Sequence, residues 1–442
     1  MTKTKAFAQI LIALLILAIF SVLPLSMGAL VTFSVGDVYA VPLGDESFFP
    51  ESPGMAGKTT NDFRGGALTF DMDMINAENI ERDGKSIWVA VIDTGMLPNW
   101  DYFFPKARIE GDLGIGFYED PVTGEFYETD WDIALSGHGT HVASTIIGYS
   151  FRGTPIDGIA PLAKIIPIKV LWWEYAGLPN RAAGSTRMVK AGIDHVTAIK
   201  EANPDMKIVI NLSLGAGVPI LEIEEAINNA IDHGIIVVAA AGNAGYDGMD
   251  WPGAYPQVIS AGWAGWTGQW YTGGGFWLDD VPEDLMTPCV WSEIYGPIAG
   301  TQVYMDVDSG RELEDQDLDV VAPGGWVVGP YWTPLWGPLP DDPRQCYAYA
   351  GGTSMASPHV AGTAALMMQK KGKPLVQSDI ETILETTADI APVTYANGWI
   401  WGLPEPFAAI FLDPYGLWIT WWDWNAVGEG FLRADAAVEM AG

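Results

Sequence analysis

The chain has 442 residues, of which 49% are hydrophobic and 17% charged, which excludes a disordered protein of low hydrophobicity. Its 55 acidic and 22 basic residues give a formal net charge of -33, which repels phosphate backbones and argues against nucleic acid as a partner. The two cysteines, Cys289 and Cys346, are too few for a disulfide framework or a zinc site, and the sequence leaves open whether they pair.

Residues 1–40 are predicted to be a signal peptide or an N-terminal membrane anchor. Two lysines precede an apolar run over residues 6–35, which is typical of an export signal. Residues 38–40 offer a site for signal peptidase, with a mature start at Val41. The run also reaches the roughly 20 residues needed to cross a bilayer, so retention as an anchor is the alternative. Both interpretations place the rest of the chain outside the cytoplasm, as an extracellular or cell-surface protein.

Residues 41–80 are predicted to be a short polar extension, and residues 81–442 a single domain. Short, β-branched apolar runs predict strands buried on both faces, at 87–92, 207–212 and 235–241. Helical patterns fill the intervals, at 139–147, 186–202, 222–233 and 354–370. This alternation predicts an α/β fold with a mostly parallel sheet and helices on both faces.

A Trp-rich stretch around residues 262–318 breaks the alternation and is predicted to be an insertion. The chain contains 20 tryptophans, more than one core of this size needs. Packing of aromatic rings between long loops is the favoured interpretation. The alternative is an exposed adhesive face for polypeptide, glycan or a partner protein.

Asp93 ends the first predicted strand and is followed by Thr94 and Gly95. Functional side chains of open parallel sheets lie at the carboxyl ends of strands, so this carboxylate is a candidate site residue. The pattern is weak by itself, because nucleotide-binding and metal-dependent α/β enzymes share it.

His138 and His141 flank a Gly-Thr pair at the start of a predicted helix of small residues. Their position at a Gly-rich helix start favours acid–base chemistry for His138 over a purely structural role. Two histidines three residues apart could also bind a metal ion, although no glutamate stands at the spacing of zinc peptidases.

Asn243 follows the predicted strand 235–241, at the same edge of the sheet as Asp93. A side-chain amide in that position can donate a hydrogen bond to an oxyanion. A turn residue or a helix cap is the alternative interpretation.

Ser354 lies in the Gly-rich segment 351–362, at the first turn of a predicted helix. Free N–H groups and the helix dipole stabilise negative charge there, so the Ser354 N–H can join Asn243 in an oxyanion hole. This arrangement predicts a nucleophile. A simple N-cap serine does not require a Gly-rich turn before it and an Ala-rich helix after it.

The sequences V-I-D-T-G, H-G-T-H-V-A, A-A-G-N and G-T-S-M-A-S-P-H-V-A-G resemble the defining motifs of the subtilisin-like serine peptidases, the subtilases, in the order Asp, His, Ser. The resemblance runs from about Lys85 to the end, so no large C-terminal domain is expected. It implies a three-layer catalytic domain and an endopeptidase that forms an acyl-enzyme on Ser354, with His138 as general base and Asp93 orienting it.

The family resemblance also assigns substrate binding to a strand that contains Ser213, Leu214 and Gly215. It implies polypeptide substrates and no cofactor for the chemistry. Structural Ca²⁺ is common in the family, and acidic loops such as 306–319 could supply ligands, although no particular metal site is identified. The segment before the core is too short for the folded inhibitory propeptide that many relatives carry.

Two other functions compete with the peptidase interpretation. Asp93-Thr94-Gly95 and Asp308-Ser309-Gly310 mimic the paired motifs of aspartic proteases, but the second copy lies in a charged stretch instead of a buried strand. The other alternative is a catalytically silent binding or structural module at the cell surface, which the intact Asp, His and Ser argue against.

Overall fold

The computed structural model describes residues 31–35, 39–43, 66–173, 175–178, 181–271, 281–369, 374–395 and 406–442. Phe33–Gly442 form one unit, which is the subject of the description below. Most of the predicted signal or anchor lies outside the described residues. Within these ranges, no helix combines the length and the apolar character needed to span a membrane.

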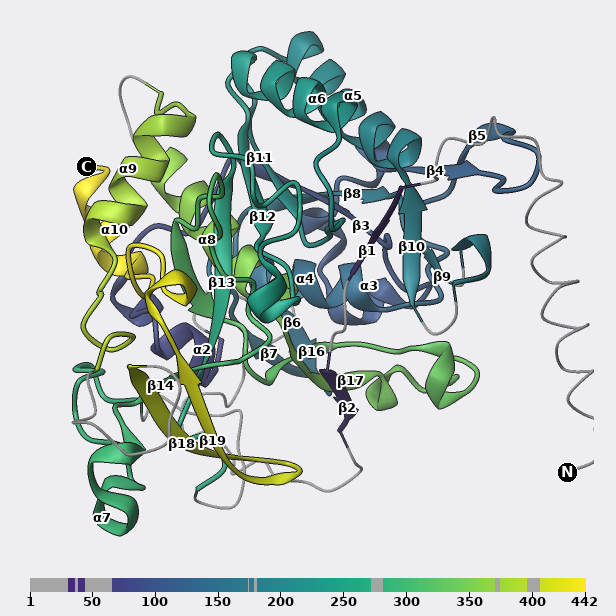
Figure 1. Cartoon of the computed structure of the whole chain (residues 1–442). Helices are drawn as coiled ribbons and strands as arrows, with labels where there is room; N and C mark the ends of the chain where they lie inside the picture. Colours follow the sequence, from purple (N-terminus) through teal and green to yellow (C-terminus); the bar gives the residue numbers. More distant parts are fainter. Residues whose placement is uncertain are drawn as a thin grey trace, which may run out of the picture. The chain divides into compact units, whose positions relative to one another are not determined.

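The described chain is built on a nine-stranded sheet in the order β14-β13-β12-β11-β3-β8-β4-β5, with β15 also paired to β13 (Figure 1). All pairs are parallel except β13–β14 and β4–β5. The strand bounds are β3 Ile87–Asp93, β4 Ile115–Glu119, β5 Phe126–Thr129, β8 Lys164–Lys169, β11 Lys207–Leu212, β12 Ile236–Ala240, β13 Ile259–Trp266, β14 Val303–Met305 and β15 Val320–Pro323.

Helices cover both faces of this sheet, which explains why its central strands are apolar throughout. The helices α5 (Thr186–Ala202) and α6 (Leu221–Asp232) pack together on one face. On the other face, α4 (His138–Ile147) and α8 (Thr353–Met368) pack together, and α8 runs along β11, β12 and β13. The predicted fold class is confirmed, and the predicted limits of β11 and α5 are the observed ones.

Smaller sheets and helices surround the central layers. The minor sheets have the orders β1-β10-β9, β16-β17-β2, β18-β19 and β6-β7. Their bounds are β1 Thr32–Ser34, β2 Tyr39–Pro42, β6 Tyr149–Phe151, β7 Thr154–Ile156, β9 Trp172–Trp173, β10 Ala182–Ser185, β16 Val327–Pro330, β17 Tyr347–Gly351, β18 Phe407–Asp413 and β19 Gly416–Trp422. The remaining α-helices are α2 Phe70–Asp73, α3 Trp100–Phe103, α7 Ser292–Tyr295, α9 Gln377–Thr387 and α10 Ala434–Met440.

The packed core starts before residue 81, where the sequence predicted its first residue. Phe70 and Met72 are buried in the main hydrophobic cluster, and Phe33 is fully buried. The polarity of residues 41–80 hid Phe70 and Met72, and Phe33 lies in the apolar run that predicts export. The unit therefore includes chain that the sequence assigned to the signal and the extension.

The Trp-rich stretch begins within the sheet instead of outside it. Trp263 and Trp266 are buried residues of the strand β13, so the insertion begins only after residue 266. Trp291, Trp326 and Trp422 are also buried, which supports the packing interpretation for most tryptophans that the structure describes. The exposed exceptions are Trp418 and Trp424, on and just after the hairpin strand β19.

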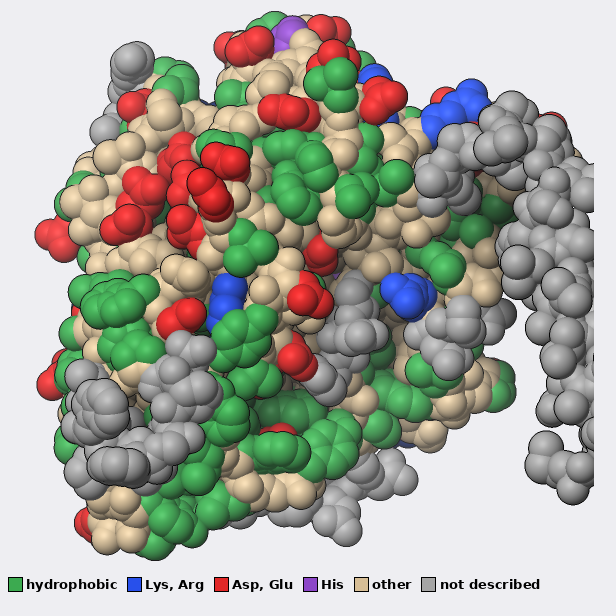
Figure 2. All heavy atoms as spheres, viewed as in Figure 1, with side chains coloured by type: hydrophobic (Ala, Val, Ile, Leu, Met, Phe, Trp, Pro, Cys, Tyr) green, Lys and Arg blue, Asp and Glu red, His purple; other side chains and the backbone are tan. Residues whose placement is uncertain are grey.

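Cys289 and Cys346 are both buried and unpaired, which settles the question that the sequence left open. On the surface, acidic side chains gather over the visible face with few basic ones among them (Figure 2). This distribution agrees with the negative surface predicted from the net charge of -33.

Candidate active site

Asp93 and His138 form a buried pair at the carboxyl edge of the sheet. Asp93 is the last residue of β3 and His138 the first of α4, and both side chains are fully buried. The His138 Nδ1 lies 2.8 Å from Asp93 Oδ1 and 2.9 Å from Oδ2. A carboxylate in this position orients the ring and fixes the tautomer with a proton on Nδ1, leaving Nε2 able to accept a proton.

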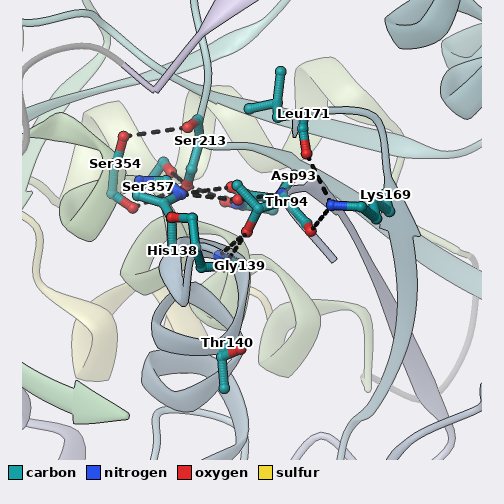
Figure 3. A network of polar contacts seen from close by, with 12 residues as sticks. Asp93, Thr94, His138, Gly139, Thr140, Lys169, Leu171, Ser213, Ser354 and Ser357 are labelled. Carbon is teal, nitrogen blue, oxygen red and sulfur yellow. Dashed lines mark hydrogen bonds and ion pairs between the residues drawn. The ribbon is translucent and has the colours of Figure 1, made fainter. Parts of the chain in front are cut away.

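Thr94 connects the end of β3 to the start of α4 (Figure 3). Its Oγ1 accepts a hydrogen bond of 2.9 Å from the Gly139 N–H and donates one of 3.1 Å to the Ser136 carbonyl oxygen. A Cβ on Gly139 would lie 2.5 Å from the Gly95 carbonyl oxygen, so only glycine allows this approach. The Thr-Gly and His-Gly pairs in the sequence are thus required for the Asp93–His138 contact.

Ser354 lies in the first turn of α8, directly against the predicted substrate-binding strand. Its Oγ donates to the Ser213 carbonyl oxygen at 3.2 Å, and Ser213 Oγ donates to the Ser354 carbonyl oxygen at 2.9 Å. Ser213 Oγ also lies 2.7 Å from Ser357 Oγ. These contacts fix the start of α8 to the end of β11.

The hydroxyl of Ser354 is directed to Ser213, not to His138. The Nε2 atom of His138 is buried and has no hydrogen-bond partner. Bonds between a nucleophile and its base are often long before substrate binds, and they tighten in the complex. For His138 to accept a proton from Ser354, the Ser354 side chain would first have to turn toward it.

Asn243 is fixed beside Ser354 by the residue that precedes the nucleophile. The Thr353 N–H and Oγ1 both donate to Asn243 Oδ1 at 2.9 Å. The oxygen is thereby occupied, and the amide N–H₂ of Asn243 remains available to donate. This arrangement fits the predicted donor to an oxyanion.

An extended segment of the chain itself lies along the predicted substrate-binding strand. The Ser34 N–H donates to the Gly215 carbonyl oxygen at 2.9 Å, and the Gly215 N–H donates to the Ser34 carbonyl oxygen at 2.9 Å. This is an antiparallel bridge, and β1 also belongs to the small sheet of β10 and β9. The edge formed by Gly215 can therefore pair with an extended peptide backbone.

Lys169 is a site neighbour that the sequence reasoning missed. Its buried Nζ donates to the carbonyl oxygens of Thr94 at 2.9 Å and Leu171 at 3.1 Å, and it lies 4.1 Å from the centre of the Trp172 ring. Burial lowers its pKa to about 7, although the negative charge of Asp93 opposes this shift. The detectable signal was a lysine at the carboxyl end of an otherwise apolar strand, β8.

The other buried histidines have separate partners. His141 Nε2 donates to the Val327 carbonyl oxygen at 3.1 Å, and burial lowers its pKa to about 4. His359 Nε2 lies 3.1 Å from Asp71 Oδ2. Since His138 and His141 contact different groups, the geometry does not support a shared metal ion.

A group of three carboxylates could hold a metal ion away from the Asp93–His138 pair. The side chains of Asp319, Glu381 and Glu385 each offer an oxygen within 4.8 Å of the others, the one such group among the residues described. Burial raises the pKa of Glu381 to about 7, and the charges of Glu385 and Asp317 add to this shift. Carboxylate oxygens are the ligands that Ca²⁺ prefers.

Comparison with known proteins assigns the family. Residues 84–402 match the model of the Subtilase family. The chain is 32% identical to Subtilisin BL of Lederbergia lenta over 294 residues, covering 66% of this chain and 80% of that protein. It is 30% identical to Thermitase of Thermoactinomyces vulgaris over 307 residues, covering 70% and 82% of the two chains.

A third relative has a lower sequence identity but is matched over more of its length. Subtilisin DY of Bacillus licheniformis is 29% identical over 328 residues, which cover 73% of this chain and 91% of the relative. These matches leave no room for the aspartic protease alternative. The chain belongs to the subtilase family and is a subtilisin-like serine endopeptidase.

Proposed function

We propose that Asp93, His138 and Ser354 are the catalytic triad of a secreted or surface-anchored endopeptidase. The bond from His138 Nδ1 to Asp93 carries this proposal, because it leaves Nε2 as the free base in a site next to Ser354. The closeness of Ser354 to the edge at Ser213 supports the choice of nucleophile.

In the proposed mechanism, His138 Nε2 accepts the Ser354 hydroxyl proton while Ser354 Oγ attacks the carbonyl carbon of a peptide bond. The Asp93 carboxylate stabilises the imidazolium that forms. His138 then donates the proton to the leaving amine, and the acyl group remains on Ser354. A water molecule, deprotonated by His138, hydrolyses the acyl-enzyme and restores the hydroxyl.

The oxyanion of each tetrahedral intermediate is proposed to lie between the Asn243 side-chain amide and the Ser354 backbone N–H. The occupied Oδ1 of Asn243 supports this assignment, because it directs the N–H₂ group away from Thr353. The N–H of Ser354 belongs to the first turn of α8, where N–H groups lack acceptors within the helix. Donors fixed in advance require no reorganisation as charge develops.

The segment Ser213, Leu214 and Gly215 is proposed to bind substrate as an added antiparallel strand. The bridge from Gly215 to Ser34 supports this, because it uses both backbone groups that a substrate residue would use. Recognition through backbone groups is independent of side chains and suits polypeptides of varied sequence.

Export through residues 1–40 is proposed from the basic start and the apolar run at 6–35. The apolar run would serve either as a cleaved signal or as an anchor. The formal net charge of -33 argues against nucleic acid as a partner in either case.

One experiment tests the chemistry and the location together. The full chain is expressed in a bacterial host, and the medium, membranes and cytosol are treated with a fluorophosphonate and assayed on denatured casein. We expect casein hydrolysis in the medium or on the outer membrane face, abolished by the reagent, with the adduct on Ser354. An adduct on another serine, or hydrolysis that resists the reagent, would disprove the triad. Folded, unlabelled and inactive protein would favour the silent binding module.

A structural Ca²⁺ is proposed at Asp319, Glu381 and Glu385. Three carboxylates close together in a partly buried site repel one another when charged, and a divalent cation would relieve this repulsion. The cation would contribute to stability and to no step of the reaction.

Addition of Ca²⁺ is expected to stabilise the fold by about 2 to 3 kcal/mol at a hundredfold excess over its dissociation constant. The measurement is thermal unfolding of the full chain carrying Ser354→Ala, in Ca²⁺ and in chelator. Glu381→Gln should remove most of the effect, whereas Glu314→Gln, an exposed neighbour in the acidic stretch, should preserve it. An equal response of both variants would place the ion elsewhere.

A further inference from the structure

Asp250 places a carboxylate against two glycines, Gly215 and Gly242, in segments next to the candidate active site. A Cβ on Gly215 would lie 2.6 Å from Asp250 Cβ and 3.0 Å from its Oδ2. A Cβ on Gly242 would lie 2.7 Å from the same Oδ2. Any side chain at either glycine would collide with Asp250, so the two backbones and the carboxylate form one close arrangement.

Both glycines belong to segments that contact the nucleophile. Gly215 is two residues after Ser213, whose carbonyl oxygen accepts the hydrogen bond from Ser354. Gly242 directly precedes Asn243, which is held by the residue before Ser354. Asp250 therefore lies against the two segments proposed to bind the substrate backbone and the oxyanion.

Backbone hydrogen bonds hold Asp250 in this place from both sides. Its N–H donates to the Ala241 carbonyl oxygen at 2.8 Å. The next residue, Trp251, exchanges hydrogen bonds of 2.9 Å and 2.8 Å with Ala216, just beyond Gly215. The position of the carboxylate is thus determined by the same strands that position the candidate substrate site.

The carboxylate has no charge partner in the part of the chain that the structure describes. No lysine, arginine or histidine there forms an ion pair with Asp250, and no group donates a hydrogen bond to its side chain. The side chain is half-buried, and burial alone raises its pKa. A carboxylate partly removed from water without a partner is costly, and a cation that approached it would recover that energy.

The direction of the strand at Gly215 shows which part of a substrate Asp250 would meet. Ser34 pairs with Gly215 in antiparallel orientation, so a chain bound there continues toward Ser213 and Ser354. Residues paired with this edge precede the bond that Ser354 would attack. Asp250 therefore lies beside the N-terminal side of that bond.

We propose that Asp250 is a specificity-determining residue that binds the ammonium or guanidinium group of a substrate lysine or arginine, so that cleavage follows basic residues. The proposal rests on the proposed function and specifies its substrate class. Neither glycine carries a side chain, so the Asp250 carboxylate is the polar group that a charged end entering between the two backbones would meet. An acidic side chain is repelled from the same position.

The first test compares peptides that differ only in the residue before the cleaved bond, with arginine, lysine, phenylalanine or glutamate there. For the full chain we expect kcat/KM to be about 10- to 100-fold higher for arginine and lysine than for phenylalanine, and lowest for glutamate. Asp250→Asn should bring this ratio close to one. It should leave kcat/KM for the phenylalanine peptide within about threefold of the value for the unsubstituted chain. Asp247→Asn, an exposed carboxylate in the same loop, should change neither value.

The second test is independent of catalysis. Binding of benzamidine, an amidinium cation, is measured by calorimetry on the full chain with Ser354→Ala, and we expect at least tenfold weaker binding when Asp250→Asn is added.

A preference for phenylalanine, or benzamidine binding unaffected by Asp250→Asn, would overturn the proposal. If the phenylalanine peptide is cleaved and the arginine peptide is not, the peptidase stands and the role of Asp250 falls. If no peptide is cleaved and Ser354 is not labelled, the proposed function fails, while benzamidine still reports on Asp250.

Discussion

Replacing Ser354 by alanine is expected to lower kcat on casein or a peptide by on the order of 10⁴- to 10⁶-fold. The substitution removes the oxygen that forms the acyl bond, while the backbone N–H and the Asn243 amide remain to bind the oxyanion. A small rate above that in water should therefore persist. The measurement is kcat, calculated from the total protein concentration because the variant cannot be titrated at its active site. Circular dichroism checks that the variant is folded.

Ser357→Ala is the matched control for this substitution. Ser357 lies on the same helix and its Oγ contacts Ser213 Oγ at 2.7 Å, but it has no role in the proposed mechanism. We expect it to cost stability through the lost hydrogen bond, by about 1 kcal/mol, and to keep most of the activity. Comparable activity of the Ser354→Ala variant and the wild type would show that another residue is the nucleophile.

Replacing Asp93 by asparagine is expected to lower kcat by on the order of 10⁴-fold. An amide cannot stabilise the imidazolium, and its N–H₂ group favours the tautomer with the proton on Nε2, which then cannot act as the base. The loss should shrink at high pH, where stronger external nucleophiles and bases compete. The measurement is the pH profile of kcat/KM.

The chain offers a second buried carboxylate–histidine pair as a control. Asp71 Oδ2 lies 3.1 Å from His359 Nε2, and both groups are buried. Asp71→Asn should lower the stability of the fold about as much as Asp93→Asn does. It should leave kcat within about tenfold of the wild-type value. Equal losses of activity in the two variants would mean that Asp93 acts through stability alone.

The sequence predicted the central layers because their residues face apolar surroundings on every side. The strand β11 and the helix α5 have the predicted limits, since each is set by a polar residue at a change of periodicity. Asp93 and Asn243 were predicted at the same sheet edge from strand ends alone, and the structure places Asp93 against the start of α4 and Asn243 against the start of α8.

The remaining features depend on contacts between distant segments, which no local pattern encodes. Ser34 lies in the apolar run that predicts export, and nothing near it indicates a partner at Gly215. Asp250 occupies an ordinary loop in the sequence. Its importance follows from its close contact with the backbones of Gly215 and Gly242, which are distant in the chain. In the sequence, Lys169 is only the last residue of a strand. Its role is visible only in the fold, where its Nζ donates to the carbonyl oxygens of Thr94 and Leu171.

If substrate pairs with the edge at Gly215 as proposed, the bridge between Ser34 and Gly215 makes the molecule a competitor of its own substrates. A tethered strand meets its docking edge at an effective concentration that is fixed by the length of the connection and reaches the millimolar range for short links. Dilution of the protein does not weaken such a contact, whereas cutting the tether removes it permanently. Newly synthesised enzyme should therefore have low activity at first. The activity should rise with time, as the segment that carries Ser34 is cut, and the rise should not depend on the protein concentration.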